Sequence, residues 1–157
     1  MYSHKSAEYK NPFQAIIDNG NFDSIHTNKE DIFYQDNDIS AFISSKQWPN
    51  NPGNVIIIPN TDYENIYDIP DNLLAKIHIF SKKVAIAMKE LYKCDGVSIR
   101  QHNEPAGNQE VWHYHLHVFP RYEGDDLYSL HKQSFSSDPV SRAEFATKLK
   151  DYFNNNN

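Results

Sequence analysis

Three of the eight histidines in the chain, His113, His115 and His117, occupy alternate positions within five residues, in the stretch HYHLHVFPR. Histidine can act as a nucleophile, a proton donor or acceptor, a phosphate contact or a metal ligand near neutral pH. The positions between them hold Tyr114 and Leu116. Strict alternation of this kind predicts a β-strand that sends the two sets of side chains to opposite faces. The three imidazoles are therefore expected in one row.

The strand is predicted over residues 111–119, because a helix would scatter both sets of side chains around its axis. Metal binding is one interpretation of the row, in which two of its histidines and another residue such as His102 would be ligands. In a strand, however, the Cα atoms of His113 and His117 would lie about 13 Å apart, so the three imidazoles would not readily share one ion. An incidental polar face is another interpretation, but buried imidazoles without partners are costly.

Nucleophilic catalysis accounts for the three histidines together. A neutral imidazole is a good nucleophile toward phosphorus, and its neighbours can orient it, donate to phosphate oxygens and protonate a leaving group. On this interpretation His115 attacks the phosphorus. His113 and His117 position it and stabilise the transferring phosphate.

The composition limits the partners of the chain. A net charge of −6 argues against non-specific binding to nucleic acid, which needs clustered basic side chains. A small anion can still bind where Arg100, Arg121 and the histidines make a local positive site. The single Cys94 favours a reducing compartment, so a cytoplasmic location is expected. The N-terminal segment is polar and the apolar runs are short, which predicts neither secretion nor a membrane span.

The elements that must position the row can be predicted from periodicity and turn residues. A single domain of the α+β class is expected over residues 11–153, built on an antiparallel sheet with one long helix packed across it. Residues 1–10 are predicted to be a flexible lead-in and residues 154–157 a disordered tail. Helices are expected over residues 12–19, 71 to about 95 and 140–153. The long middle helix would have Asp71 as its cap and Gly96 at its end. Strands are expected over residues 32–35, 39–44, 55–58, 97–101 and 111–119.

The run His113–Phe119 resembles the His-φ-His-φ-His-φ-φ signature of the histidine triad (HIT) family of nucleotide hydrolases and transferases, where φ is an apolar residue. The segment PGNVIIIP from Pro52 and the loop from Asn103 to Gln109 follow in family order. The sequence of residues 121–125 is similar to that of the family branch that contains dinucleoside polyphosphate hydrolases. The resemblance implies five antiparallel strands per subunit, a homodimer and a purine nucleotide substrate.

The resemblance also implies roles for individual residues. His115 would form a covalent nucleotidyl intermediate, and Gln109 would hold the leaving group or bridging oxygen. Asn103 would lie near the phosphate. The base and ribose would lie beside three apolar side chains and one hydroxyl: Phe13, Ile16, Phe42 and Ser44.

Several positions depart from the family pattern. Many members bind a structural zinc through a Cys-x-x-Cys pair, a loop histidine and the first triad histidine, but this chain has Asn11, Gln14 and Asn54 at the other three positions. We therefore predict no metal and no cofactor. Ser44 replaces an aspartate that grips the ribose, and its hydroxyl cannot make the same charge-assisted pair. Glu110 stands where Ser or Thr often contacts the phosphate, so its side chain is expected either to turn away or to pair with a histidine.

Overall fold

A computed structural model describes residues 2–18, 20, 22 and 27–156 of the 157-residue chain. Five antiparallel strands form its main sheet in the order β1-β2-β4-β6-β5. Their bounds are Ile32–Gln35 for β1, Ile39–Ile43 for β2, Val55–Pro59 for β4, Gly96–Gln101 for β5 and Leu116–Arg121 for β6. The central strands β2 and β4 are buried at every position, as their nearly continuous apolar sequences require. A separate short pair, β3 at Lys46–Gln47 and β7 at Phe135–Ser136, was not predicted.

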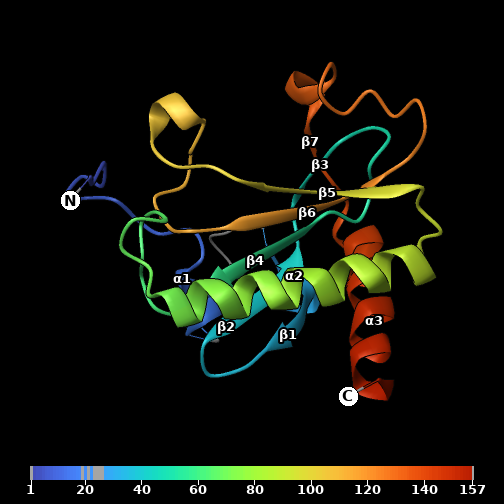
Figure 1. Cartoon of the computed structure of the whole chain (residues 1–157), viewed down its shortest axis with the longest axis horizontal. Helices are drawn as coiled ribbons and strands as arrows, with labels where there is room; N and C mark the ends of the chain where they lie inside the picture. Colours follow the sequence, from blue (N-terminus) through green and yellow to red (C-terminus); the bar gives the residue numbers. More distant parts are fainter. Residues whose placement is uncertain (1, 19, 21, 23–26, 157) are drawn as a thin grey trace.

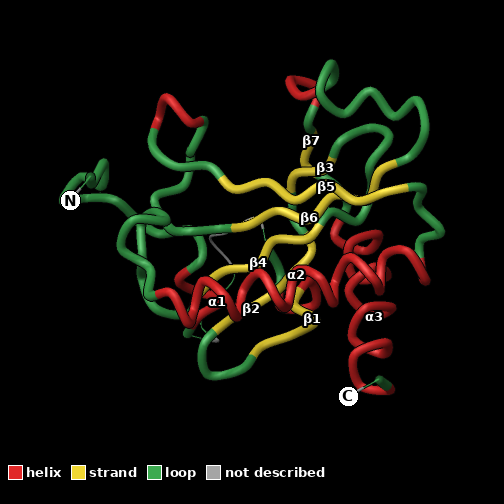
Figure 2. The backbone as a smooth tube through the Cα atoms, in the orientation of Figure 1, coloured by secondary structure: helices red, strands yellow, loops and turns green. Residues whose placement is uncertain are grey.

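One long helix, α2 at Asp71–Leu91, lies across one face of this sheet (Figure 1). Its buried side chains recur at three- and four-residue steps and pack with those of β4 and β6. The helix α3 at Pro139–Asn155 packs near β1 and one end of α2 (Figure 2). The α+β class and the five-stranded antiparallel sheet with one long helix are thereby confirmed. The remaining helices are short: α1 at Gln14–Ile17, η1 at Lys29–Asp31, η2 at Pro105–Gly107 and η3 at His131–Gln133.

The apolar core has two parts, one on each face of the sheet. The larger part lies under α2 and includes Tyr114, Leu116 and Val118. The smaller part lies on the opposite face and is formed by Phe13, Ile16, Phe42, Ile56 and Ile58, which we call the Phe42 cluster. The alternation in the histidine stretch therefore separates the two faces as predicted, because its apolar side chains join the core under α2.

The predicted strand at residues 111–119 begins five residues too early. β6 starts at Leu116, and the chain bends at residues 111–113. If the register of β6 with β4 continued, Tyr114 would face Pro59, which has no N–H to donate. The backbone N–H of Tyr114 instead donates to the carbonyl oxygen of Tyr63 at 2.6 Å. His113 and His115 are thus held by side-chain and loop contacts instead of by a strand ladder.

The predicted ends of the long helix also need correction. Pro70 occupies the N-cap position, so Asp71 is the first helical residue and supplies no capping hydrogen bond. At the other end, the helix stops after Leu91 and Lys93 adopts a φ of 56°. Gly96 begins β5 and does not end the helix. The first predicted helix, residues 12–19, is only the four-residue α1, and its expected end at Asn19 lies outside the described residues.

The N-terminal residues 2–10 run along the loop that follows β4. The Ser3 hydroxyl donates to Glu64 at 2.5 Å, and the Lys5 ammonium donates to Asp62 at 2.6 Å. The helix α3 continues to Asn155, beyond its predicted end. The division of the chain into a lead-in, a domain over residues 11–153 and a tail stays a prediction. Among the described residues, the helices fall short of the length and apolar character that a membrane span requires.

Candidate active site

The three triad histidines lie together on the face of the sheet opposite α2, because the side chains between them, Tyr114 and Leu116, join the core under that helix. The ring centroids of His115 and His117 are 5.3 Å apart, in a nearly perpendicular arrangement. Phe13 touches the other end of the row, with its ring 5.7 Å from that of His113 and 5.8 Å from that of His115. The predicted row of imidazoles is therefore present, although only His117 belongs to a strand.

His115 is held in one orientation by its own backbone neighbour. Its Nδ1 lies 2.7 Å from the carbonyl oxygen of His113, so Nδ1 carries the proton and donates it. Burial, with smaller contributions from His113 and His102, lowers the pKa of His115 to about 4. At neutral pH the ring is uncharged, and its Nε2 has an unshared electron pair. This tautomer is the one that a nitrogen nucleophile needs.

His113 is fixed through both ring nitrogens. Its Nε2 donates to the carbonyl oxygen of Pro59 at 2.9 Å, and its Nδ1 accepts from the Asn11 amide at 3.0 Å. Asp62 Oδ1 lies 3.2 Å from the same Nδ1. Burial lowers the pKa of His113, and the nearby Asp62 carboxylate only partly offsets that effect. Both ring nitrogens of neutral His113 therefore have hydrogen-bond partners. These bonds fix the position of the residue, whose backbone carbonyl oxygen in turn orients His115.

The residues at the positions of the family's structural zinc do not fit that ion. Side-chain amides stand at Asn11, Gln14 and Asn54 in place of cysteine and histidine. The lone pair of His113 that a metal would need accepts a hydrogen bond from Asn11, and Asn54 donates to the carbonyl oxygen of Lys46. No group of three His, Cys, Asp or Glu side chains that could hold a metal occurs among the described residues.

His117 stands next to His115 at the start of β6. Its ring stacks on Phe119 with a centroid distance of 5.4 Å. Its Nδ1 is buried, and no hydrogen-bond partner for it is found in the described part of the chain. Burial lowers the pKa of His117 well below its ordinary value, and the neighbouring His115, His102 and Arg100 add to that shift. A buried nitrogen without a partner indicates a group that completes its contacts with a ligand.

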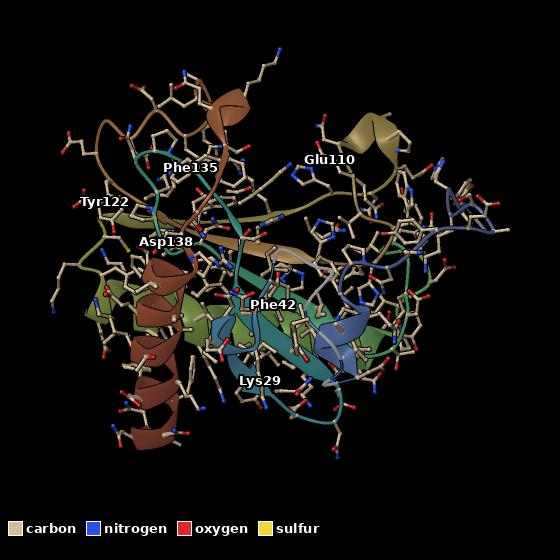
Figure 3. All side chains as sticks on the ribbon, turned by 180° about the vertical axis from the view of Figure 1, so that it is seen from behind. Lys29, Phe42, Glu110, Tyr122, Phe135 and Asp138 are labelled. Carbon is tan, nitrogen blue, oxygen red and sulfur yellow. The ribbon has the colours of Figure 1, made fainter. Side chains whose placement is uncertain are left out.

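The Phe42 cluster lies beside the row and includes Phe13, Ile16 and Phe42, for which contact with the base and ribose stays a prediction. All three side chains are buried, and Phe42 lies in the middle of the face opposite α2 in Figure 3. Ser44 is also buried, at the end of β2, where its backbone N–H donates to the carbonyl oxygen of Asn54. The structure therefore brings these four residues to the side of the row where β2 and β4 lie.

Two side chains of the loop after β5 that were expected to contact the substrate, Gln109 and Asn103, form hydrogen bonds within the protein instead. The Gln109 amide donates to the carbonyl oxygens of Glu64 and Val111, at 2.6 and 2.9 Å, and accepts from the backbone of Glu104. Both of its N–H groups are thus committed. Asn103 accepts from the N–H of Ile66 and exchanges hydrogen bonds with Gln101. In this arrangement both side chains shape the loop and do not face the histidines with free donors.

Glu110 turns away from the row, which is one of the two outcomes expected for it. Its side chain is 81% exposed, and its nearest ionic partner is Lys46 at 3.5 Å. Its carboxylate nevertheless acts to raise the pKa of His115, against the larger effect of burial.

Two further residues, His102 and Asp62, lie near the triad histidines and act on their pKa values, which the sequence did not indicate. His102 donates from Nδ1 to the carbonyl oxygen of Gly107 at 2.7 Å, and its charge lowers the pKa of both His115 and His117. The sequence indicates His102 only as an additional metal ligand. It gives no signal for Asp62, since nothing in the surrounding residues indicates its approach to His113.

The chain was compared with known proteins. The sequence model described as the HIT domain matches residues 26–124. An uncharacterised HIT-like protein of Methanocaldococcus jannaschii is 35% identical over 94 residues, which are 60% of this chain and 70% of that protein. The crystal structure of a Hit-like protein involved in cell-cycle regulation from Bartonella henselae has a TM-score of 0.75 and 26% identity, covering 94% of this chain and 98% of that one.

Two yeast relatives have names that state an activity. An adenosine 5'-monophosphoramidase of Saccharomyces cerevisiae is 34% identical over 73 residues, which are 46% of this chain and 44% of the relative. A bis(5'-adenosyl)-triphosphatase of the same species is 32% identical over 111 residues, which are 63% of this chain and 50% of the relative. The chain thus spans about half the length of these two relatives. The family match covers more than half of the chain, and together with the histidine row it shows that the chain belongs to the HIT family.

Proposed function

We propose that the protein hydrolyses a phosphoanhydride or phosphoramidate bond of a purine nucleotide through a covalent nucleotidyl-His115 intermediate. The observation that carries this proposal is the hydrogen bond from Nδ1 of His115 to the carbonyl oxygen of His113, because it leaves Nε2 bare in a ring whose pKa is about 4. The named activities of the two yeast relatives supply the substrate classes.

In the first step, Nε2 of His115 forms a bond to the α-phosphorus while the bond from that phosphorus to the leaving group breaks. The imidazole becomes positively charged, and its Nδ1–H stays on the carbonyl oxygen of His113, which stabilises the charge. A phosphate leaving group departs as an anion, whereas an amine must receive a proton. That proton is supplied by solvent, because burial keeps the three triad histidines neutral at neutral pH.

In the second step, water attacks the phosphorus and the bond to Nε2 breaks. The product is a nucleoside monophosphate, one proton is released, and His115 returns to its neutral form. Binding of the nucleoside on the Phe42 cluster would hold the α-phosphorus over Nε2 during both steps. If a second phosphate compound replaces water as the acceptor, the same intermediate makes the protein a nucleotidyltransferase.

The test compares the wild type with His115→Asn on diadenosine tetraphosphate and on adenosine 5'-phosphoramidate, with a chelator present. We expect turnover by the wild type and a loss of at least about 10³-fold in the variant, since the covalent route is removed. After a quench that avoids acid, intact mass should show one added nucleotidyl group on the wild type alone.

The matched control is His78→Asn, which changes an exposed histidine on α2, on the other side of the sheet. It should retain wild-type rates. Equal rates in His115→Asn and the wild type would contradict the proposal, as would turnover without any trapped adduct in a rapid quench.

A nucleotide-binding module without turnover is the second candidate. It is favoured by Gln109, whose two N–H groups are already committed, and by Ser44 in place of a carboxylate. Such a module would bind adenosine monophosphate measurably in calorimetry and give no product from either substrate. That pair of results would replace the hydrolase proposal.

We also propose that the protein forms a homodimer through the β5 edge of the sheet, and that it acts in the cytoplasm. Strand β5 is the last strand in the sheet order, and Ile99 on it is 46% exposed. Ile79 and Ile86 on α2 are exposed at a seven-residue spacing, on one face of the helix. Light scattering should give twice the chain mass, and Ile99→Glu should give the monomer mass.

A further inference from the structure

Arg100 on β5 is placed next to the histidine row. In the antiparallel register of β5 and β6 it lies directly opposite His117, so both side chains stand on the same face of the sheet. Its guanidinium carbon is 4.8 Å from the centroid of the Phe119 ring, and Phe119 stacks on His117. The positive charge of Arg100 is close enough to lower the pKa of His117.

The guanidinium of Arg100 has hydrogen-bonding capacity that the described residues do not use. Its Nε and Nη2 atoms are buried and have no hydrogen-bond partner there. It also takes part in none of the salt bridges of the described residues, whereas nearby Arg121 is held by both carboxylate oxygens of Asp125, at 2.6 and 2.7 Å. Arg100 as a whole is half-buried, but buried guanidinium N–H groups without a partner are costly unless a ligand completes them.

Aromatic rings enclose this guanidinium. The Tyr128 ring centroid lies 4.4 Å from the guanidinium carbon, and Phe119 lies 4.8 Å away. Hydrogen bonds with Ser98 and, to a smaller extent, with Arg100 lower the pKa of the Tyr128 hydroxyl. Contacts to two rings hold the planar group in place, and they leave its in-plane N–H groups to bind an oxyanion.

The sheet order separates this charge from the Phe42 cluster. That cluster is built on β2, β4 and α1, on one side of β6, while Arg100 comes from β5 on the other side. A nucleotide with its α-phosphorus at His115 and its nucleoside on the Phe42 cluster would direct its leaving group toward Arg100. The buried Nδ1 of His117, also without a partner in the described residues, lies between the two regions.

We propose that Arg100, beside His117, is an anion subsite that binds the second and later phosphates of a polyphosphate leaving group. This inference rests on the proposed function and makes it more specific: the preferred substrates are nucleoside polyphosphates or dinucleoside polyphosphates, because a phosphoramidate carries only nitrogen where Arg100 would bind phosphate. Arg100 is a specificity-determining residue and leaves the attack by His115 unchanged.

Glu110 is the carboxylate that could oppose an anion here. Its side chain is largely exposed, and its ion pair with Lys46 at 3.5 Å offsets its charge. The net field at the subsite is therefore set by Arg100, which lacks a carboxylate partner among the described residues.

The experiment measures Arg100→Gln and Arg100→Lys on two substrates, diadenosine tetraphosphate and adenosine 5'-phosphoramidate. For Arg100→Gln we expect kcat/KM to fall about 10- to 100-fold on the tetraphosphate, the range for loss of charge-assisted hydrogen bonds. The value on the phosphoramidate should stay close to that of the wild type. The kcat/KM of Arg100→Lys on the tetraphosphate should lie between those of the wild type and Arg100→Gln, since lysine keeps the charge and loses the planar guanidinium. Lys83→Gln, which removes the same charge from exposed α2, is the matched control.

A second measurement needs no turnover, so it separates this inference from the proposed function. Calorimetric binding of inorganic triphosphate should weaken at least about 10-fold in Arg100→Gln, whether or not either substrate is hydrolysed. If Arg100→Gln does not fold, the side-chain Nε–H resonance of Arg100 in the wild type, assigned with Arg100→Lys, should shift on addition of triphosphate. Equal losses on both substrates, unchanged triphosphate binding or an unmoved resonance would each overturn the subsite.

Discussion

Acid should destabilise the protein because His115 is buried in its neutral form. Its side chain is 7% exposed, and burial lowers its pKa from 6.5 to about 4. One pKa unit corresponds to about 1.4 kcal/mol, so a shift of this size disfavours the charged ring in the folded state by about 3 kcal/mol. The pKa values of His113 and His117 are shifted in the same direction.

The sign follows from proton binding in the two states. Between the unfolded pKa of 6.5 and the folded pKa of about 4, the unfolded chain binds a proton that folded His115 does not. The free energy of unfolding therefore falls as the pH falls through this window. The contribution of His115 to the free energy of unfolding is present in full above pH 6.5 and is lost as the pH approaches 4.

Urea unfolding at pH 7.5, 6.0, 5.0 and 4.5 measures this dependence in the wild type and in His115→Asn, with His78→Asn as the control. Between pH 6 and 5, the variant should lose about 1 kcal/mol less stability than the wild type, because one titrating group has been removed. His78→Asn should follow the wild type more closely. Identical slopes in His115→Asn and the wild type would refute the assigned burial, and so would an NMR titration that places the pKa of His115 near 6.5.

Three further changes test other parts of the structure. Asp31→Asn leaves the buried Arg142 without its carboxylate, 3.0 Å away, and should cost about 3 to 5 kcal/mol in urea unfolding; a cost below about 1 kcal/mol would contradict that ion pair. Gly53→Ala should lower the Tm by several degrees, because its φ is +82° and a Cβ would lie 2.7 Å from Phe145; an unchanged Tm would show that the loop relaxes freely. Glu104→Gly should raise the free energy of unfolding by about 1 kcal/mol, since Glu104 has a φ of 62°, and a decrease would show that its side-chain contacts outweigh the strain.

Local patterns were sufficient for the parts of the fold that depend on neighbouring residues. The strand at Ile32–Gln35 has the predicted bounds, and the long helix begins within one residue of its predicted start. Alternation also placed the imidazoles opposite the core side chains at Leu116 and Val118. In each case the signal is a period along the chain that burial on one face imposes directly.

The remaining features depend on residues that are distant in the sequence. The late start of β6 follows from Pro59 and from the carbonyl oxygen of Tyr63, about fifty residues before Tyr114. The hydrogen bond from Asn11 to His113 joins positions 102 residues apart. A single sequence contains no periodicity that reports such pairs. The engagement of Gln109 by three backbone groups likewise depends on how its loop folds, so its side chain could be named in advance but its contacts could not.

The distribution of charge on the face opposite α2 connects the site with the choice of substrate. Burial keeps the three histidines neutral, so the row offers nitrogen lone pairs and N–H donors but little positive charge at neutral pH. A nucleophile benefits from this neutrality, since protonation would remove its lone pair. A substrate with several phosphates nevertheless needs a cation close by, and guanidinium keeps its charge at every relevant pH. Arg100 can therefore supply charge two strands away from the Phe42 cluster without protonating His115, which is why we expect its loss to change the substrate preference more than the chemistry.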